Sequence, residues 1–213
     1  MDKVKLERPF FVVNPKAYLY GSDLQKLAKK TDELCKKYKF QCLFTAQLID
    51  LPWVIEHCPH LLPCAQSMES LVPGRGMGHV LPEALAAAGV KATFLNHAEN
   101  PMTIHELAAT IARANEVGIL TCVCADSVEE AQAIAELHPD IMTCVKKISP
   151  KTKVLQAAGI HSGQNVFNAI LWGADATGGT SGIVTAKDPF AVLDEMFAAL
   201  DQARSALSQN EIF

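Results

Sequence analysis

The sequence lacks the features that define several large protein classes. No apolar run reaches the roughly 18 residues that a membrane-spanning helix needs, and the start, MDKVKLERPFFVV, passes from charged residues straight into a strand-like run instead of a signal peptide. The formal net charge is only −4, so no excess of basic residues indicates a nucleic-acid or membrane surface. We therefore expect a cytoplasmic protein that binds neither nucleic acid nor membranes.

Cysteine occurs, but not in a pattern that holds metal or forms a disulfide framework. The seven cysteines are an odd number, no C-x-x-C pair is present, and most lie in apolar runs, as reduced and buried thiols do. Cys122 and Cys124 would share one face of a strand, yet no second ligand pair follows them. No G-x-G-x-x-G follows the first strand-like run either. We expect no metal, no cofactor and no dinucleotide-binding fold.

Strand-like and helix-like runs alternate along all 213 residues, which predicts a parallel sheet covered by helices. Eight strand-like runs with no change in composition between the halves favour one closed (β/α)8 barrel, a single domain over 1–213, with an open doubly wound sheet as the alternative. The expected strands are 9–13, 41–46, 61–66, 92–95, 119–124, 141–144, 154–158 and 174–177. The expected helices are 22–38, 48–58, 81–88, 103–117, 127–137, 165–172 and 189–207, with Ser22 as an N-cap and Ser127-x-x-Glu130 as a capping box.

One interval is too short for this scheme. Only about nine residues, VKKISPKTK, separate the sixth strand from Val154. Neighbouring parallel strands need a crossover of roughly a dozen or more residues, usually with a helix. Either the protein has lost its sixth crossover helix, or the printed sequence lacks a stretch that the protein carries. The second case predicts a break or an abnormal distance near Cys144 and Val145.

Polar residues follow the first and fourth strands, where a parallel barrel places its chemistry. Lys16, in Asn14-Pro15-Lys16, can reach a phosphate or enediolate oxygen, although a lysine taken alone is more typical of a solvated surface residue. Asn96, His97 and Glu99 end the fourth strand abruptly. A neutral His97 can polarise a carbonyl; the plain alternative is a strand-end histidine bonded to the backbone.

Two glycine-rich turns follow the seventh and eighth strands, at 159–163 (GIHSG) and 178–182 (GGTSG). Backbone N–H groups in such turns can cradle a phosphate. Either turn alone also fits a plain strand-to-helix connection. Together, after the last two strands, they indicate the phosphate site that recurs in these barrels.

With these residues identified, the sequence resembles the triosephosphate isomerase family, and in particular its shorter archaeal-type branch. The resemblance covers nearly the whole chain and rests on five segments: VNPKAY, GMGHVLPEALAAAGVKATFLNHAEN, ILTCVCADSVEEA, KVLQAAGIHSGQNV and GADATGGTSGIVTAKDP. It implies a TIM barrel and an aldose–ketose isomerase of glycolysis and gluconeogenesis. The implied reaction interconverts dihydroxyacetone phosphate and glyceraldehyde 3-phosphate through an enediolate.

The resemblance also implies roles for individual residues. Asn14 and Lys16 would bind the substrate, His97 would be the electrophile, and Glu99 would pair with Lys16 and hold the site together. The loop 73–78 (PGRGMG) would contact a neighbouring subunit of a homodimer or homotetramer. The phosphate would be held through the backbone of Gly159, Gly179, Thr180 and Ser181.

One departure from the family matters more than the matches. The family's base is a glutamate just after strand six, at the start of a mobile lid, but here that strand continues into 144–147 (CVKK). No glutamate lies between Glu136 and Glu195, and neither a valine nor a protonated lysine abstracts a proton next to a carbonyl. Three hypotheses stay open: an isomerase whose base lies in a stretch not printed, a phosphosugar-binding pseudoenzyme, and a Schiff-base aldolase using Lys146 or Lys147.

Overall fold

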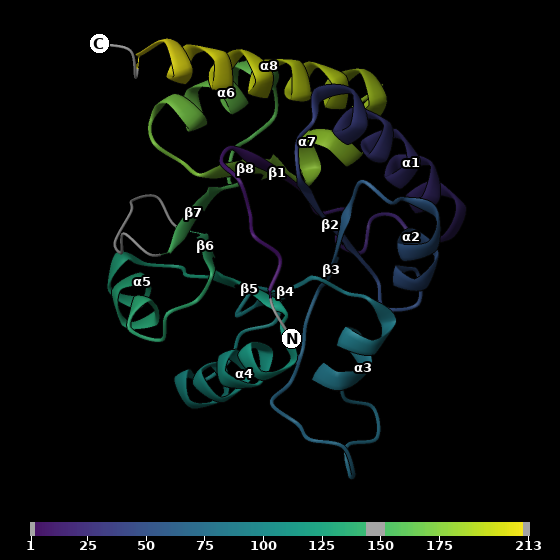
Figure 1. The fold of residues 1–213 in the computed structure, drawn as a ribbon, viewed down its shortest axis with the longest axis vertical. Helices are drawn as coiled ribbons and strands as arrows, with labels where there is room; N and C mark the ends of the chain where they lie inside the picture. The colour runs from purple at the N-terminus through teal and green to yellow at the C-terminus, as the bar shows by residue number, and fades with distance from the viewer. Residues whose placement is uncertain (1–2, 144–151, 211–213) are drawn as a thin grey trace.

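The structure, a computed structural model, describes residues 3–143 and 152–210, with side chains described as far as residue 208. Eight parallel strands pair in chain order and the first pairs with the last, so the sheet closes into a barrel (Figure 1). The predicted (β/α)8 TIM barrel is confirmed, and the open sheet is not found. The strands are β1 (Phe10–Val13), β2 (Cys42–Ala46), β3 (Leu62–Ala65), β4 (Ala92–Leu95), β5 (Leu120–Cys124), β6 (Ile141–Thr143), β7 (Lys153–Gln156) and β8 (Ala176–Gly179).

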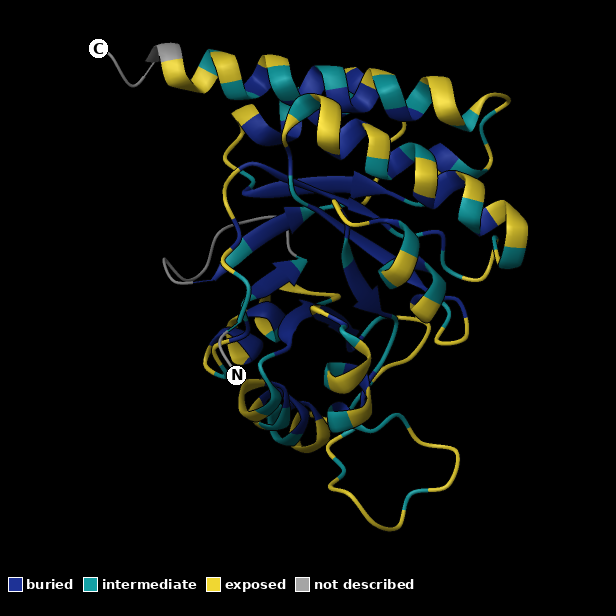
Figure 2. Cartoon of the chain, turned by 45° about the vertical axis from the view of Figure 1, so that its right-hand side comes forward, coloured by how far each residue is buried: buried dark blue, intermediate teal, exposed yellow. Residues whose placement is uncertain are grey.

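The helices surround this barrel, with their buried sides turned toward the strands (Figures 1 and 2). The short α7 follows β8 directly, and the long α8 packs on α1 and α6. The helices are α1 (Gly21–Tyr38), α2 (Leu51–His57), α3 (Pro82–Ala88), α4 (Ile104–Val117), α5 (Val128–Ala135), α6 (Gly163–Leu171), α7 (Ser181–Val184) and α8 (Pro189–Asn210).

Strands β6 and β7 are direct neighbours, with Ile141 opposite Lys153 and Met142 opposite Val154. The sheet therefore closes although only residues 144–152 join these two strands, fewer than the dozen expected. The predicted break near Cys144 lies outside the described residues.

Several expected boundaries were wrong for identifiable reasons. Strand β8 includes Gly178 and Gly179, which were expected in the following turn, because Gly178 lies against β1: a Cβ there would be 1.9 Å from the carbonyl oxygen of Val12. Helix α1 begins at Gly21, whose N–H donates to Asp50 (3.1 Å), so Ser22 is not its N-cap.

Other boundaries moved by a few residues: β7 ends at Gln156 instead of 158, and α6 begins at Gly163 instead of 165. The N-cap of α6 is Ser162, whose hydroxyl accepts the N–H of Asn165 at 3.3 Å.

The two capping sequences behave differently. Thr103 and Glu106 form a complete capping box at the start of α4. The expected box of α5 forms only in part: Ser127 Oγ accepts the N–H of Glu130 at 3.0 Å, but the Glu130 carboxylate accepts the N–H of Asp126 (2.6 Å) instead of that of Ser127. The other oxygen of Glu130 accepts a hydrogen bond from the side chain of Asn96.

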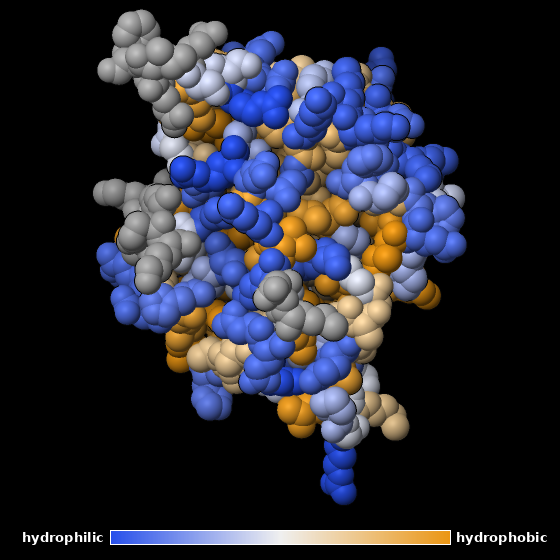
Figure 3. All heavy atoms as spheres, in the orientation of Figure 1, coloured by the Kyte–Doolittle hydropathy of each residue, from blue (hydrophilic) through white to orange (hydrophobic). Residues whose placement is uncertain are grey.

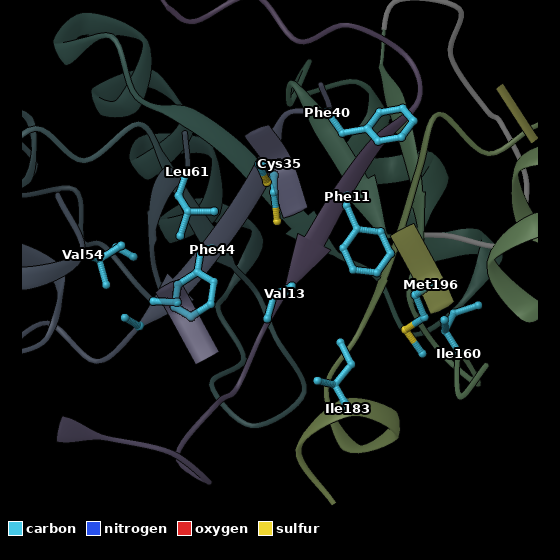
Figure 4. Close-up of a cluster of buried hydrophobic side chains, with 14 of the residues drawn as sticks. Phe11, Val13, Cys35, Phe40, Phe44, Val54, Leu61, Ile160, Ile183 and Met196 are labelled. Carbon is cyan, nitrogen blue, oxygen red and sulfur yellow. The ribbon is translucent and has the colours of Figure 1, made fainter. Parts of the chain in front are cut away.

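The core has two layers, because successive side chains of a strand point to opposite faces. Phe10 and Val12 of β1 point into the barrel, whereas Phe11 and Val13 point outward, toward the helices. Figure 4 shows part of the outer layer, with Phe11 and Phe44 between strands and helices. Each such buried side chain contributes about 1.5–3 kcal/mol.

The N-terminal segment crosses the barrel opening at the N-terminal ends of the strands (Figure 1). Leu6 is 6% exposed and packs with the interior residues, Lys3 Nζ binds Asp140 Oδ2 at 2.5 Å, and Arg8 binds Asp175 at 2.7 Å. Hydrophilic residues cover most of the face that this view presents, with small apolar groups between them (Figure 3). This end of the barrel is therefore closed.

The connection between β3 and α3 extends away from the body of the molecule (Figure 2). Its base is held by Glu69 and Val80, which exchange two hydrogen bonds of 3.1 and 2.6 Å, and by Arg113, whose Nε donates to the carbonyl of Leu71 at 3.1 Å. Within this connection, Met77 is fully exposed. Of the helices in the described ranges, none is long and apolar enough to span a membrane.

Candidate active site

A cavity of about 310 Å³ opens at the C-terminal ends of the strands. It brings together seven of the eight residues that the sequence singled out: Asn14, Lys16, His97, Gly159, Gly179, Thr180 and Ser181. The eighth, Glu99, lines an adjoining cavity of about 240 Å³ that shares Asn14, Lys16 and His97 with the first. Residues from both ends of the sequence thus meet at one rim of the barrel.

The backbone of Lys16 is held in one conformation by neighbouring side chains. Its φ of 49° is left-handed, a conformation that non-glycine residues adopt only when neighbours hold them in it. Here Asn14 Oδ1 accepts the Lys16 N–H at 3.0 Å, and Gln66 Nε2 donates to the Lys16 carbonyl at 2.8 Å. Thr45 donates to the same Asn14 oxygen at 2.7 Å. The lysine side chain therefore leaves β1 in a defined direction.

Lys16 and Glu99 form an ion pair, with Nζ and Oε1 2.9 Å apart. The hydrogen bond from Lys16 holds the pKa of Glu99 below its usual range. The lysine side chain is 27% exposed and the glutamate side chain 67% exposed, so the ammonium is the better shielded partner. The pairing expected from the resemblance is present in the structure.

His97 is bonded so that its tautomer can be assigned. Its Nδ1 accepts the backbone N–H of Glu99 at 3.1 Å, which requires a lone pair on Nδ1 and places the proton of the neutral ring on Nε2. Burial, followed by the positive charge of Lys16, lowers the pKa of His97, against the opposing effect of Glu99 and Asp126. At neutral pH the ring is an uncharged N–H donor, which is the form that can polarise a carbonyl.

The two glycine-rich turns pack closely on each other. A Cβ on Gly182 would lie 2.4 Å from the carbonyl oxygen of Ile160, and Gly159 has a left-handed φ of 74°. Side chains at Gly182 or at Gly178, next to Val12, would force the turns apart. The N–H groups of Gly159, Thr180 and Ser181 make no hydrogen bond to other described residues. They are available to an anion.

The N–H groups at the start of α6 are less available to an anion than the sequence suggested. The Gly163 N–H donates to Glu195 Oε1 of α8 at 2.7 Å, and the His161 N–H donates to Asn165 Oδ1 at 3.1 Å. One backbone donor just before the N-cap and one at the first residue of α6 are therefore already satisfied within the protein. A bound anion would rely on the β8–α7 turn and on Gly159.

The floor of the cavity carries neutral groups. Cys124 Sγ lies 3.8 Å from Thr143 Oγ1, and burial raises the pKa of this thiol to about 11, so it stays protonated. Among the described residues that line the cavity, none is an aspartate or glutamate. Within the described ranges, no cluster of three or more histidine, cysteine or acidic residues could hold a metal ion.

Three residues that support the site were not assigned that role from the sequence. Thr45 and Gln66 hold Asn14 and Lys16, and Asn96 binds the ends of neighbouring elements. Gln66 and Asn96 are polar residues directly after a strand, which is a detectable signal. Thr45 gives less indication, because a threonine inside a strand is ordinary.

Fold and site together define a (β/α)8 barrel with a polar, histidine- and lysine-containing cavity at its C-terminal face. A family model described as "Triosephosphate isomerase" matches residues 9–161. The chain belongs to the triosephosphate isomerase family.

Archaeal relatives agree with this assignment. The triosephosphate isomerase of Methanothermus fervidus is 28% identical over 223 residues, covering 92% of this chain and all of the relative. That of Sulfolobus acidocaldarius is 28% identical over 217 residues, covering 89% of this chain and 94% of the relative. The crystal structure of triosephosphate isomerase from Bartonella henselae superposes with a TM-score of 0.68 at 15% identity, covers 93% of this chain and 99% of that one, and supports the fold.

The alignment with the M. fervidus protein also shows how many positions of the relative this chain lacks. The alignment spans 223 positions but takes in 92% of the 213 residues here, which is about 196. About 27 positions of the relative thus have no counterpart in this chain. That deficit is large enough to hold a crossover helix with the loop before it.

Proposed function

We propose that the protein is a triosephosphate isomerase-like, intramolecular aldose–ketose isomerase that interconverts dihydroxyacetone phosphate and glyceraldehyde 3-phosphate. The observation that carries this proposal is a single cavity lined by a neutral imidazole, an ammonium and two glycine-rich turns with free N–H groups. Membership of the family supports it.

Each group would serve one part of a bound triose phosphate. The Nε2–H of His97 would donate to the carbonyl oxygen, and Lys16 would offset the charge that develops there. The N–H groups of Gly159, Thr180 and Ser181 would bind the phosphate, with Gly179 fixing the start of that turn. Asn14 and Glu99 would keep Lys16 in place through the contacts described above.

The base is the missing part. Proton abstraction next to a carbonyl needs a positioned base, and no carboxylate is found among the described cavity residues. We therefore expect efficient turnover only if the protein carries a glutamate in a stretch not printed here. The same observation favours a second candidate, a phosphosugar-binding protein that has lost its base and lid.

Three measurements on the purified full-length protein separate these candidates. An intact mass of 23.0 kDa would establish the shorter chain, whereas about 3 kDa more would reveal the additional stretch of about 27 residues. A coupled isomerase assay then reports turnover, and calorimetry with dihydroxyacetone phosphate reports binding. Turnover supports the isomerase, and binding without turnover supports the second candidate. If neither turnover nor binding is detected, both candidates are contradicted.

We also propose that residues 1–213 form one cytoplasmic domain that assembles into a homodimer or homotetramer, without metal, cofactor, nucleic acid or membrane. The supporting feature is the β3–α3 connection, which extends from the body with Met77 exposed and in which 73–78 is the expected contact. Sedimentation velocity would test this, and a monomer at all concentrations would contradict it.

A further inference from the structure

The side chain of Asn96, the residue before His97, uses both of its polar atoms in hydrogen bonds. Asn96 is 8% exposed and has a left-handed φ of 53°. Its Nδ2 donates to the carbonyl of Cys124 (3.0 Å) and to Glu130 Oε1 (2.9 Å), and its Oδ1 accepts the N–H of Met102 (2.9 Å). One amide therefore joins the end of β5, the first turn of α5 and the segment that leads into α4.

Glu130 completes the connection. Its second oxygen accepts the N–H of Asp126 at 2.6 Å, which explains why the carboxylate does not close the capping box of α5. The carboxylate thus bridges the β5–α5 connection to Asn96, and through Asn96 to the β4–α4 connection. We refer to Asn96 and Glu130 together as the amide–carboxylate clasp.

The clasp acts on the segment that determines how the imidazole is bonded. His97 follows Asn96 directly, so the left-handed conformation of Asn96 sets the direction in which the chain leaves β4. Beyond it, the His97 carbonyl accepts the N–H of Asn100 at 2.7 Å, and Met102 is fixed by Asn96 itself. The Glu99 N–H that donates to His97 Nδ1 lies between Asn96 and Met102, the two ends of this segment that the Asn96 side chain joins.

We propose that the amide–carboxylate clasp is a positioning element that holds the β4–α4 connection so that His97 keeps its proton on Nε2. The inference rests on the proposed role of His97 as electrophile, because only a fixed tautomer presents an N–H to the cavity. Without the clasp, the Glu99 N–H and the ring would no longer be held together, and the proton would exchange between the two nitrogens.

The charged groups around the ring do not replace the clasp. Lys16 of the β1–α1 connection, Glu99 of the histidine's own segment and Asp126 of the β5–α5 connection all influence the imidazole. Lys16 disfavours the protonated ring, and the two carboxylates favour it. These charges affect whether the ring is protonated, whereas the hydrogen bond from Glu99 N–H decides which nitrogen carries the proton of the neutral ring.

The test uses the full-length protein labelled with ¹⁵N in its histidine rings. N96G removes the amide while tolerating the left-handed backbone, and E130Q replaces the bridging carboxylate. E129Q is the matched control, because Glu129 is an exposed carboxylate in the same first turn of α5. We expect distinct Nδ1 and Nε2 signals for His97 in the wild type and in E129Q, and averaged signals in N96G and E130Q.

A double variant separates positioning from a general loss of stability. In N96D, two carboxylates would face each other at positions 96 and 130. In N96D/E130Q the hydrogen bond between these positions is restored in the opposite direction, with the amide at position 130 donating to the carboxylate at position 96. The double variant should recover part of the single tautomer that N96D loses. Where turnover is measurable, N96G should lower kcat about 10- to 100-fold with little change in KM, as expected for a misplaced catalytic group.

Unchanged His97 signals in both N96G and E130Q would overturn the inference, as would a double variant no better than N96D. Failure of the proposed function is a separate outcome. If the wild type does not bind dihydroxyacetone phosphate but the variants still disturb the tautomer, the clasp stands and the function does not.

Discussion

The two ends of the barrel use their polar and charged side chains for different purposes. At the N-terminal end, Asp140 and Asp175 are bonded to Lys3, Arg8 and nearby backbone N–H groups beneath a segment that closes the opening. At the C-terminal end, Lys16 and His97 border a cavity instead. A charge that is fully bonded within the protein stabilises the fold, and a charge that faces an open cavity can act on a ligand.

From this contrast we expect the largest loss of folding stability when a charged residue at the closed end is removed. Asp175 is 2% exposed, accepts the Val154 N–H at 2.8 Å and binds Arg8. D175A would leave the buried N–H without its acceptor, and we expect the free energy of unfolding to fall by about 2–4 kcal/mol. Denaturant unfolding measures this.

The control for that substitution is D23A, because Asp23 makes an exposed ion pair with Lys26. Such a pair contributes about 0–1 kcal/mol. Equal losses in D175A and D23A would show that the closed end is not a stabilising structure.

The open end should show the reverse pattern. K16M removes the ammonium at the cavity and should weaken the binding of dihydroxyacetone phosphate about 10- to 100-fold, the effect of losing one charge-assisted hydrogen bond. Its effect on the free energy of unfolding should stay below about 1 kcal/mol. Calorimetry and denaturant unfolding measure both, with K26M as a surface control, and a large stability loss without weaker binding would contradict the contrast.

A smaller effect on stability is expected from the protonation of His97 as the pH changes. Its pKa is lowered in the folded protein, so the unfolded chain takes up a proton first as the pH falls. The contribution of this group to stability is present above about pH 6.5 and is lost as the pH falls through the folded pKa. In K16M the pKa should rise, because the repulsion from Lys16 is removed; an NMR titration that shows no rise would argue against their proximity.

The smallest effect on stability is expected at the projecting loop. M77S changes a fully exposed side chain and should alter the free energy of unfolding by less than about 0.5 kcal/mol. If the loop contacts a second subunit, the same substitution should weaken self-association in sedimentation experiments. Unaltered association would exclude Met77 from the subunit contact.

The alternation of strands and helices could be predicted because buried parallel strands are short apolar runs that end at polar residues or glycine. The same logic found Lys16 and His97 at strand ends. It placed Gly178 and Gly179 in a turn, however, because their pairing with Val12 and Val13, which makes them part of β8, is a tertiary feature. The clasp was missed for the same reason, since Glu130 lies 34 residues from Asn96 and already had a local explanation as half of a capping box.

The N-terminal segment has a practical consequence for handling the protein. Residues 3–8 lie across the end of the barrel that is remote from the cavity, anchored by Lys3, Leu6 and Arg8. A tether or fluorophore joined just ahead of that segment would point away from the mouth where small molecules enter. Molecules immobilised on a sensor chip in this way would present their receptive side to the flowing solution.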